Sequence, residues 1–290
     1  MQTQLRKATR QKAKIRLGLS SVAGGGKTYS AILIAKGLTG DLSKVAIIDT
    51  ENGSADLYSH MGEFNVLSLL PPYTPERYIA AIKECEAAGM ECIIVDSITH
   101  EWDGTGGCLD IVEELTQKDP KHNSYTQWRF VTPRHQAFVD AMLQSPAHII
   151  TTVRRKQDYD MSNQNGKTVV TKAGLKEITR EGFEYELTVN LELDQLHNAS
   201  SSKDRTGLFA DKPSFTPSVA TGELIRKWCD EGIEATKPTI TEKQLDTIIS
   251  RMQKGERGLL LKVQQNYAPL TPDQLSRLKP FEDVVIADKA

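Results

Sequence analysis

The sequence predicts an α/β fold in which helices flank a mostly parallel sheet. Two short apolar runs, at residues 45–49 and 92–96, are rich in Ile and Val, as is typical of strands buried on both faces. A glycine-rich turn separates an expected strand at residues 15–19 from an expected helix at residues 29–38. Strands that alternate with helices need crossover connections, and these favour parallel pairing.

The segments that follow continue this alternation. Their composition predicts helices at residues 75–88 and 133–143, each beginning at a proline, and a strand at residues 148–153. Alternating polarity at residues 185–193 predicts a strand nearer the edge of the sheet. Residues 158–176 are polar and have no helical period, so we expect a long loop there, of a kind that is usually functional or disordered.

A separate small domain is predicted at the C-terminus. Thr241 with Gln244, and Thr271 with Gln274, match the T-x-x-Q capping box that begins many helices, and Pro272 strengthens the second box. These signals predict about three short helices. We expect a basic N-terminal segment, a core, a linker and a helical domain, at residues 1–14, 15–232, 233–240 and 241–290.

Composition limits the classes of function. The 290-residue chain has a formal net charge of −2, so nucleic-acid binding would have to come from local patches. No acidic residue precedes Asp41, whereas basic residues crowd the N-terminus: Arg6, Lys7, Arg10, Lys12, Lys14 and Arg16.

Cysteine usage and hydropathy indicate the compartment. The four cysteines form no C-x-x-C pair, and no His cluster has zinc spacing, so we expect reduced thiols. No apolar run approaches the ~20 residues of a membrane span, and the N-terminus lacks the apolar region of a signal peptide. These features predict a cytoplasmic protein without a membrane partner.

Residues 21–28 carry the clearest chemical signal. They match the phosphate-binding loop G-x-x-x-x-G-K-[ST] at Gly26, Lys27 and Thr28, and depart from it at Ser21, where Gly is usual. Glycines let backbone N–H groups converge on phosphate oxygens, and the helix N-terminus adds positive charge. We expect Lys27 to reach the β- and γ-phosphates of ATP, and Thr28 to hold Mg²⁺. The residues expected to contact the nucleotide are Ser21, Val22, Ala23, Gly24, Gly25, Gly26, Lys27, Thr28 and Tyr29.

Two carboxylates end the apolar strands. Asp96 should lie at the carboxyl edge of the sheet, beside the phosphate-binding loop, where it would hold the Mg²⁺ shell. Glu51, two residues beyond Asp49, is the candidate base for a water that attacks the γ-phosphate. The alternatives are a turn-forming Asp and a solvated Glu.

Several segments together resemble a known family. I-I-D-T-E-N at residues 47–52, I-I-V-D-S at residues 93–97 and the G-K-T loop look like RecA-type recombinase cores, in which the catalytic glutamate follows the second strand. Three further segments resemble phage-encoded RecA-like ATPases of the single-strand-annealing recombination group: S-P-A-H-I-I at 145–150, R-E-G-F-E-Y-E at 180–186 and S-K-D-R-T at 202–206. The similarity covers about residues 13–232.

The resemblance implies further roles. It implies a RecA-like P-loop NTPase core that assembles as a ring or filament, in which Lys203 and Arg205 reach the γ-phosphate of the neighbouring subunit. A solvated basic turn is the alternative for this pair. Thr152 lies where the family has a γ-phosphate sensor, although buried strands also carry Thr for structural reasons.

Basic residues in and around the expected loop indicate DNA contacts. In RecA-type proteins this loop lines the DNA channel, and phosphate neutralisation would give sequence-tolerant single-strand binding; a solvated surface loop is the alternative. Trp102 and residues 104–107 lie where the family has a shorter DNA loop, but core packing fits Trp102 equally, and Tyr125 and Trp128 are interpreted as packing residues. The candidate DNA-binding residues are Arg154, Arg155, Lys156, Lys167, Lys172 and Lys176.

The leading functional prediction is an ATP- and Mg²⁺-dependent, single-stranded-DNA-binding recombination or annealing ATPase. It would be homo-oligomeric and would work in a bacterial host cytoplasm if phage-encoded. A single-strand DNA-binding protein is a further candidate partner, through the C-terminal domain. The alternatives are a ring-forming helicase-like or packaging motor, and a nucleotide-regulated switch or small-molecule kinase that does not bind DNA.

Overall fold

The computed structural model describes residues 7–118, 123–164, 167–233, 239–256, 258–260, 263 and 267–281, without the side chains of residues 159–173. The chain forms two compact units: Ala13–Glu231, and Met1–Lys12 with Gly232–Ala290. No helix in the described ranges is long and apolar enough to cross a membrane.

The larger unit is built on an eight-stranded sheet with the strand order β3-β2-β4-β5-β1-β7-β8, in which β6 pairs with β5. The pairs from β3 to β7 are parallel, and β7–β8 and β5–β6 are antiparallel. The strands are β1 (Arg16–Ser21), β2 (Val45–Asp49), β3 (Asn65–Ser68), β4 (Cys92–Asp96), β5 (His148–Gln164), β6 (Lys167–Glu177), β7 (Val189–Leu193) and β8 (Ala199–Asp204).

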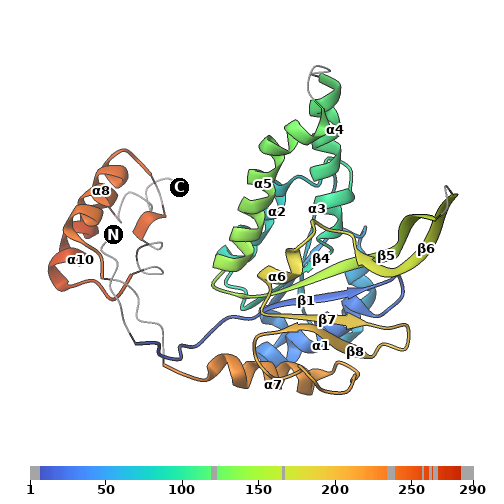
Figure 1. Ribbon diagram of the computed structural model, residues 1–290. Coiled ribbons are helices and arrows are strands. Elements are labelled where there is room, and N and C mark those ends of the chain that lie inside the picture. Colours follow the sequence, from blue (N-terminus) through green and yellow to red (C-terminus); the bar gives the residue numbers. More distant parts are fainter. Residues whose placement is uncertain are drawn as a thin grey trace. The chain divides into compact units, whose positions relative to one another are not determined.

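Helices cover both faces of this sheet, which confirms the predicted fold class. Figure 1 shows α1 (Lys27–Thr39) and α7 (Val219–Asp230) on one face, and α2 (Pro75–Ala87) and α5 (Ser124–Gln144) on the other. Neighbouring strand residues alternate between the two cores: Ile47 packs with the α1 cluster, and Ile48 with the cluster that contains Phe138 of α5. Strands buried on both faces produce the continuous apolar runs in the sequence.

The helix expected at residues 133–143 begins earlier than predicted. The structure has α5 from Ser124, where the side chain of the N-cap residue Asn123 accepts a hydrogen bond from the amide of Thr126. Pro133 therefore lies inside the helix rather than at its start. Before it come α3 (Thr99–Asp103) and α4 (Cys108–Lys118), which were not predicted.

The long loop expected at residues 158–176 is instead a hairpin made by β5 and β6, and Figure 1 shows it extending away from the sheet. The two strands pair antiparallel from Arg155 opposite Glu177 to Gln164 opposite Lys167. The dipeptide Asn165-Gly166, which is the strongest short-range hairpin signal in a sequence, stands between them. The polar composition of this segment was therefore a poor predictor of a loop. In an antiparallel pair the backbone groups hydrogen-bond to the neighbouring strand whether or not one face is buried.

The strand expected at residues 185–193 is correct only in its second half. The first residues form the short helix α6 (Phe183–Glu186), and β7 begins at Val189. The smaller unit contains α8 (Glu242–Gln253) and α10 (Pro272–Leu278), and both predicted capping boxes are present, at Thr241 and Thr271. The predicted linker lies largely outside the described residues.

Candidate functional site

The loop between β1 and α1 has the backbone that a phosphate site needs. Gly26 is the N-cap of α1 with φ 81°, a left-handed conformation that favours glycine. A Cβ on Gly25 would lie 1.8 Å from Oγ of Ser21. That hydroxyl donates to the carbonyl of Leu193 in β7 at 2.8 Å, so Ser21, the departure from the motif, anchors the loop to the neighbouring strand.

Lys27 lies at the base of this loop. Its Nζ donates to the carbonyls of Val22 at 3.1 Å and Ser21 at 3.4 Å. Burial lowers the pKa of its ammonium group, while Asp96 and Glu51 oppose that shift. A buried cation that is bonded only to loop carbonyls can turn to an anion, because phosphate oxygens accept stronger, charge-assisted bonds.

Two hydroxyls hold the carboxylate of Asp96 at the end of β4. Thr28 donates to Oδ2 at 2.6 Å and Thr152, on β5, donates to Oδ1 at 2.5 Å. Burial raises the pKa of this carboxyl, and the two hydrogen bonds oppose the rise. The pairing of a Thr hydroxyl with a buried carboxylate fits a Mg²⁺ shell, since both are hard oxygen ligands. Thr152 lies behind Asp96 and does not line the cavity described below.

Glu51 follows β2 in a turn fixed by Asp49. The Asp49 carboxylate accepts from the amide of Glu51 at 2.6 Å and from that of Ala55 at 3.0 Å. Thr50 joins the ends of β2 and β4, because its amide donates to the carbonyl of Asp96 at 2.8 Å. The turn therefore holds Glu51 beside the loop and beside Asp96.

Arg154, a predicted DNA contact, lies at the cavity. Its Nη2 and Nε lie 2.7 Å and 3.0 Å from Oε1 of Glu51, and its side chain lines the same cavity as Lys27. Its backbone amide donates to Thr99 of α3 at 2.9 Å. A guanidinium therefore holds the candidate base, and it is also a cation within reach of an anionic ligand in the cavity.

These side chains surround one cavity of about 720 Å³. The residues predicted from the loop and the strand ends that line it are Ala23, Gly24, Gly26, Lys27, Thr28, Tyr29, Glu51 and Asp96. Sequence reasoning missed Ser30, Ser54, Tyr58, His197, Thr216 and Pro217. The Tyr29 and Tyr58 rings lie 6.3 Å apart, and they give the cavity an aromatic wall that a planar base can contact. Ser30 belongs to α1, Ser54 and Tyr58 belong to a 3-10 helix (Ser54–Met61), and the other three come from loops that no motif marks.

Lys203 and Arg205 do not line this cavity. Lys203, on β8, donates to the carbonyls of Glu184 and Tyr185, and Arg205 donates to that of Tyr185 at 3.0 Å. Because β8 ends the strand order, the pair belongs to an edge of the sheet. Within one chain the two groups are thus separate from Lys27 and Asp96.

The hairpin carries three predicted DNA-binding residues whose side chains are described: Arg155, Lys156 and Lys176. Arg155 is held by Glu192 at 2.7 Å and by the carbonyl of Leu175 at 2.8 Å. Lys156 is exposed and lies opposite Lys176 in the ladder. The side chains of two further candidates lie outside the described residues: Lys167 and Lys172.

The aromatic residues near α3 divide between packing and exposure. Trp102 stacks on Trp128 with ring centroids 5.2 Å apart, which places both in a small core between the helices. Tyr125 is 84% exposed, so its interpretation as a packing residue was wrong.

The model of the AAA domain family matches residues 13–216, more than half of the chain. No curated protein sequence matches the chain. The matched range contains the phosphate-binding loop and the strand-end carboxylates, in a sheet where β5 stands between β1 and β4. The chain therefore belongs to the AAA domain family of P-loop, nucleotide-binding ATPases.

Proposed function

We propose that this protein hydrolyses ATP with Mg²⁺ and couples hydrolysis to single-stranded DNA, as a recombination or annealing ATPase that works as a ring or filament. The observation that carries the ATPase part is one cavity that joins Lys27, the Thr28–Asp96 pair and Glu51. Lys27 binds phosphate, the Thr28–Asp96 pair offers a site for the metal, and Glu51 serves as the base.

Each side chain has a definite task in this proposal. Lys27 and the loop amides bind the β- and γ-phosphates, and Thr28 and Asp96 would hold Mg²⁺, which neutralises charge on the phosphates when bound. Glu51 accepts the proton of the attacking water. Both bonds from Arg154 end on Oε1 of Glu51, so Oε2 can take the proton while Arg154 holds the carboxylate, and a γ-phosphate supplies a second anion for that guanidinium.

The separation of Lys203 and Arg205 from the cavity supports a shared site. A cation placed in trans can raise turnover by ~10³–10⁵ in related NTPases, and it makes hydrolysis depend on assembly. Both groups now bond only to carbonyls of the α6 segment among the described residues, on an edge strand that a second copy can approach.

Subunit mixing tests this arrangement. Arg205→Ala and Glu51→Gln should each be inactive alone, and a 1:1 mixture should regain activity, because roughly a quarter of randomly formed interfaces pair an intact Glu51 with an intact Arg205. The matched control is Glu51→Gln mixed with Lys27→Ala, since both defects lie on the same side of the interface and cannot complement each other. Turnover is measured over a series of ratios. No recovery, together with a monomeric mass in ATP and DNA, would favour a stand-alone nucleotide switch.

The hairpin supports the DNA part of the proposal. Two like charges directly opposite in an antiparallel ladder destabilise it, and Lys156 and Lys176 face each other in this way, with Lys176 only partly compensated by the exposed Glu181 carboxylate at 3.9 Å. An anion bound across the pair removes that repulsion. DNA phosphates are such anions, and a projecting two-stranded ribbon can follow a flexible strand.

A salt titration tests this site. Replacing both lysines, Lys156→Gln with Lys176→Gln, should reduce the log–log salt slope of single-strand binding by about 1.4, since each phosphate contact contributes ~0.7. The control, Lys36→Gln with Lys243→Gln, removes the same charge at exposed positions elsewhere and should leave the slope unchanged. Turnover should rise with single-stranded DNA in the wild type and less in the hairpin variant. An unaltered slope would show that DNA binds somewhere other than the hairpin, and the basic N-terminal segment would be the next candidate.

A further inference from the structure

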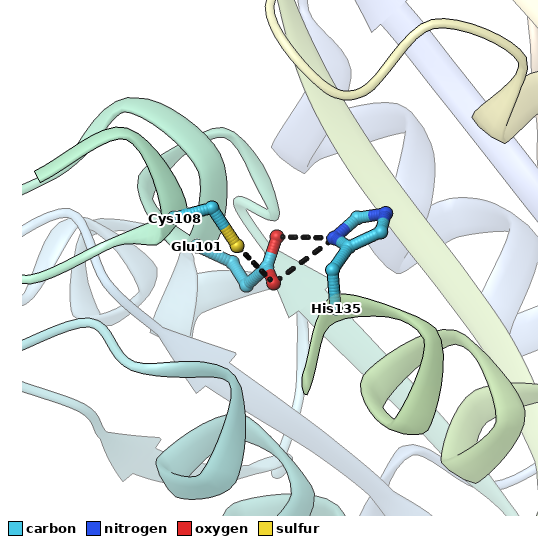
Figure 2. A group of neighbouring side chains, drawn as sticks. All are labelled: Glu101, Cys108 and His135. Carbon is cyan, nitrogen blue, oxygen red and sulfur yellow. Dashed lines mark hydrogen bonds and ion pairs between the residues drawn. The ribbon is translucent and has the colours of Figure 1, made fainter. Parts of the chain in front are cut away.

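A buried cluster of metal-ligand side chains lies behind the nucleotide cavity, outside the residues that line it. It contains Glu101 of α3, Cys108 at the start of α4, and His135 of α5, and Figure 2 shows the three converging from separate segments. The exposed fractions are 0%, 0% and 3%, and the potential ligand atoms all lie within 4.8 Å of one another.

The surroundings make this cluster unusual. Trp102 and Trp128, with Val112 and Val131, form an apolar shell around it. In the described part of the chain, the Glu101 carboxylate is hydrogen-bonded to the other two members of the cluster and to no Lys or Arg, and His135 forms an ion pair with it when its imidazole is protonated. A buried carboxylate is costly unless a cation compensates its charge.

The distances fit a divalent metal ion. Cys108 Sγ lies 3.2 Å from Oε1 of Glu101, and His135 Nδ1 lies 3.0 Å from each carboxylate oxygen. Around a tetrahedral zinc ion, with bonds of about 2.0–2.3 Å, such ligand atoms stand about 3.3–3.8 Å apart. The carboxylate lies between the thiol and the imidazole, so it must move a few tenths of an ångström away from both, and Sγ and Nδ1, which lie within 4.8 Å of each other, must come to the same spacing. A thiolate, a carboxylate and a neutral imidazole would also make the site neutral overall with Zn²⁺.

We propose that Glu101, Cys108 and His135 form a buried site for zinc, in which three protein ligands leave the fourth position to a water molecule. Three ligands of different chemistry suit zinc, which accepts sulfur, nitrogen and oxygen donors without a strong geometric preference. A bound ion links α3, α4 and α5. It would also fix α3 against the nucleotide cavity, because Thr99 of α3 accepts from the amide of Arg154 and His100 lies 2.8 Å from the hydroxyl of Thr50.

Metal loading of the full chain tests the site. We expect purified protein, loaded with Zn²⁺ or Co²⁺ and separated from free ion, to hold one equivalent, and the Co²⁺ form to show thiolate-to-metal charge-transfer absorption. A chelator should lower the unfolding midpoint by several degrees, because a ligand that binds only the folded state stabilises it.

The variants separate a metal site from a hydrogen-bonded triad. Cys108→Ser keeps a small donor to Glu101 but removes the thiolate, so it should lose the absorption, the retained ion and the chelator effect. Cys85→Ser alters another buried cysteine, outside the cluster, and should retain all three. Wild-type protein that holds no ion and unfolds identically with and without chelator would overturn the proposal, as would equal loading of the two variants. If Cys108→Ser does not fold, the wild-type Co²⁺ spectrum still decides.

Discussion

Lys27→Ala is expected to abolish tight ATP binding and to reduce turnover by at least about 10²–10³-fold, the usual cost of losing one preorganised group that stabilises charge in a transition state. The substitution removes the cation at the base of the phosphate loop, where its bonds within the described part of the chain are to the carbonyls of Val22 and Ser21. The substitution changes none of the apolar residues in the two core clusters of the sheet, so the unfolding midpoint should change little.

Nucleotide titration and steady-state turnover measure this effect. The matched control is Lys36→Ala, on the exposed face of the same helix α1, which should bind and hydrolyse ATP as the wild type does. Wild-type turnover in a folded Lys27→Ala protein would show that the loop is a turn without a phosphate function.

Glu51→Gln is expected to keep ATP and Mg²⁺ binding and to lose turnover by ~10²–10⁴-fold, the range that general bases contribute. The amide keeps a carbonyl oxygen that can accept from Arg154, so the local geometry should persist, but it cannot take up a proton. The backbone turn also remains, because Asp49 holds it through the amides of Glu51 and Ala55.

Single-turnover hydrolysis and ATP binding should be measured together for this variant. Asp56→Asn, on the same segment but outside the cavity lining, provides a control that loses a carboxylate without losing the base. If Glu51→Gln turns over within a factor of about two of the wild type, the base is another group.

The elements that could be predicted from the sequence are those with a local cause. The limits of β2 and β4 match the apolar runs residue for residue, since a strand buried on both faces must be apolar throughout. The capping boxes at Thr241 and Thr271 were predictable because each is formed by residues three apart.

Features that depend on tertiary contacts were missed. Pro133 was interpreted as the start of a helix, although packing carries α5 nine residues further toward the N-terminus, to Ser124. Arg154 follows an apolar strand and precedes a basic segment, and nothing in its spacing indicates a partner 103 residues earlier. The Glu101–Cys108–His135 cluster has no metal-binding spacing, because three separate helices bring it together.

The hairpin has one more consequence, which follows from strand β5. The same strand carries Thr152, which bonds Asp96, then Arg154, which bonds Glu51, and then continues into the ladder with β6. Suppose that a ligand on the hairpin changes the affinity for nucleotide by some factor. Thermodynamic linkage then requires that bound nucleotide change the affinity for that ligand by the same factor. If a ligand on the hairpin shifts β5 at Thr152 or Arg154, the shared strand would make each site an effector of the other, and this reciprocity would hold for binding whichever ligand arrives first.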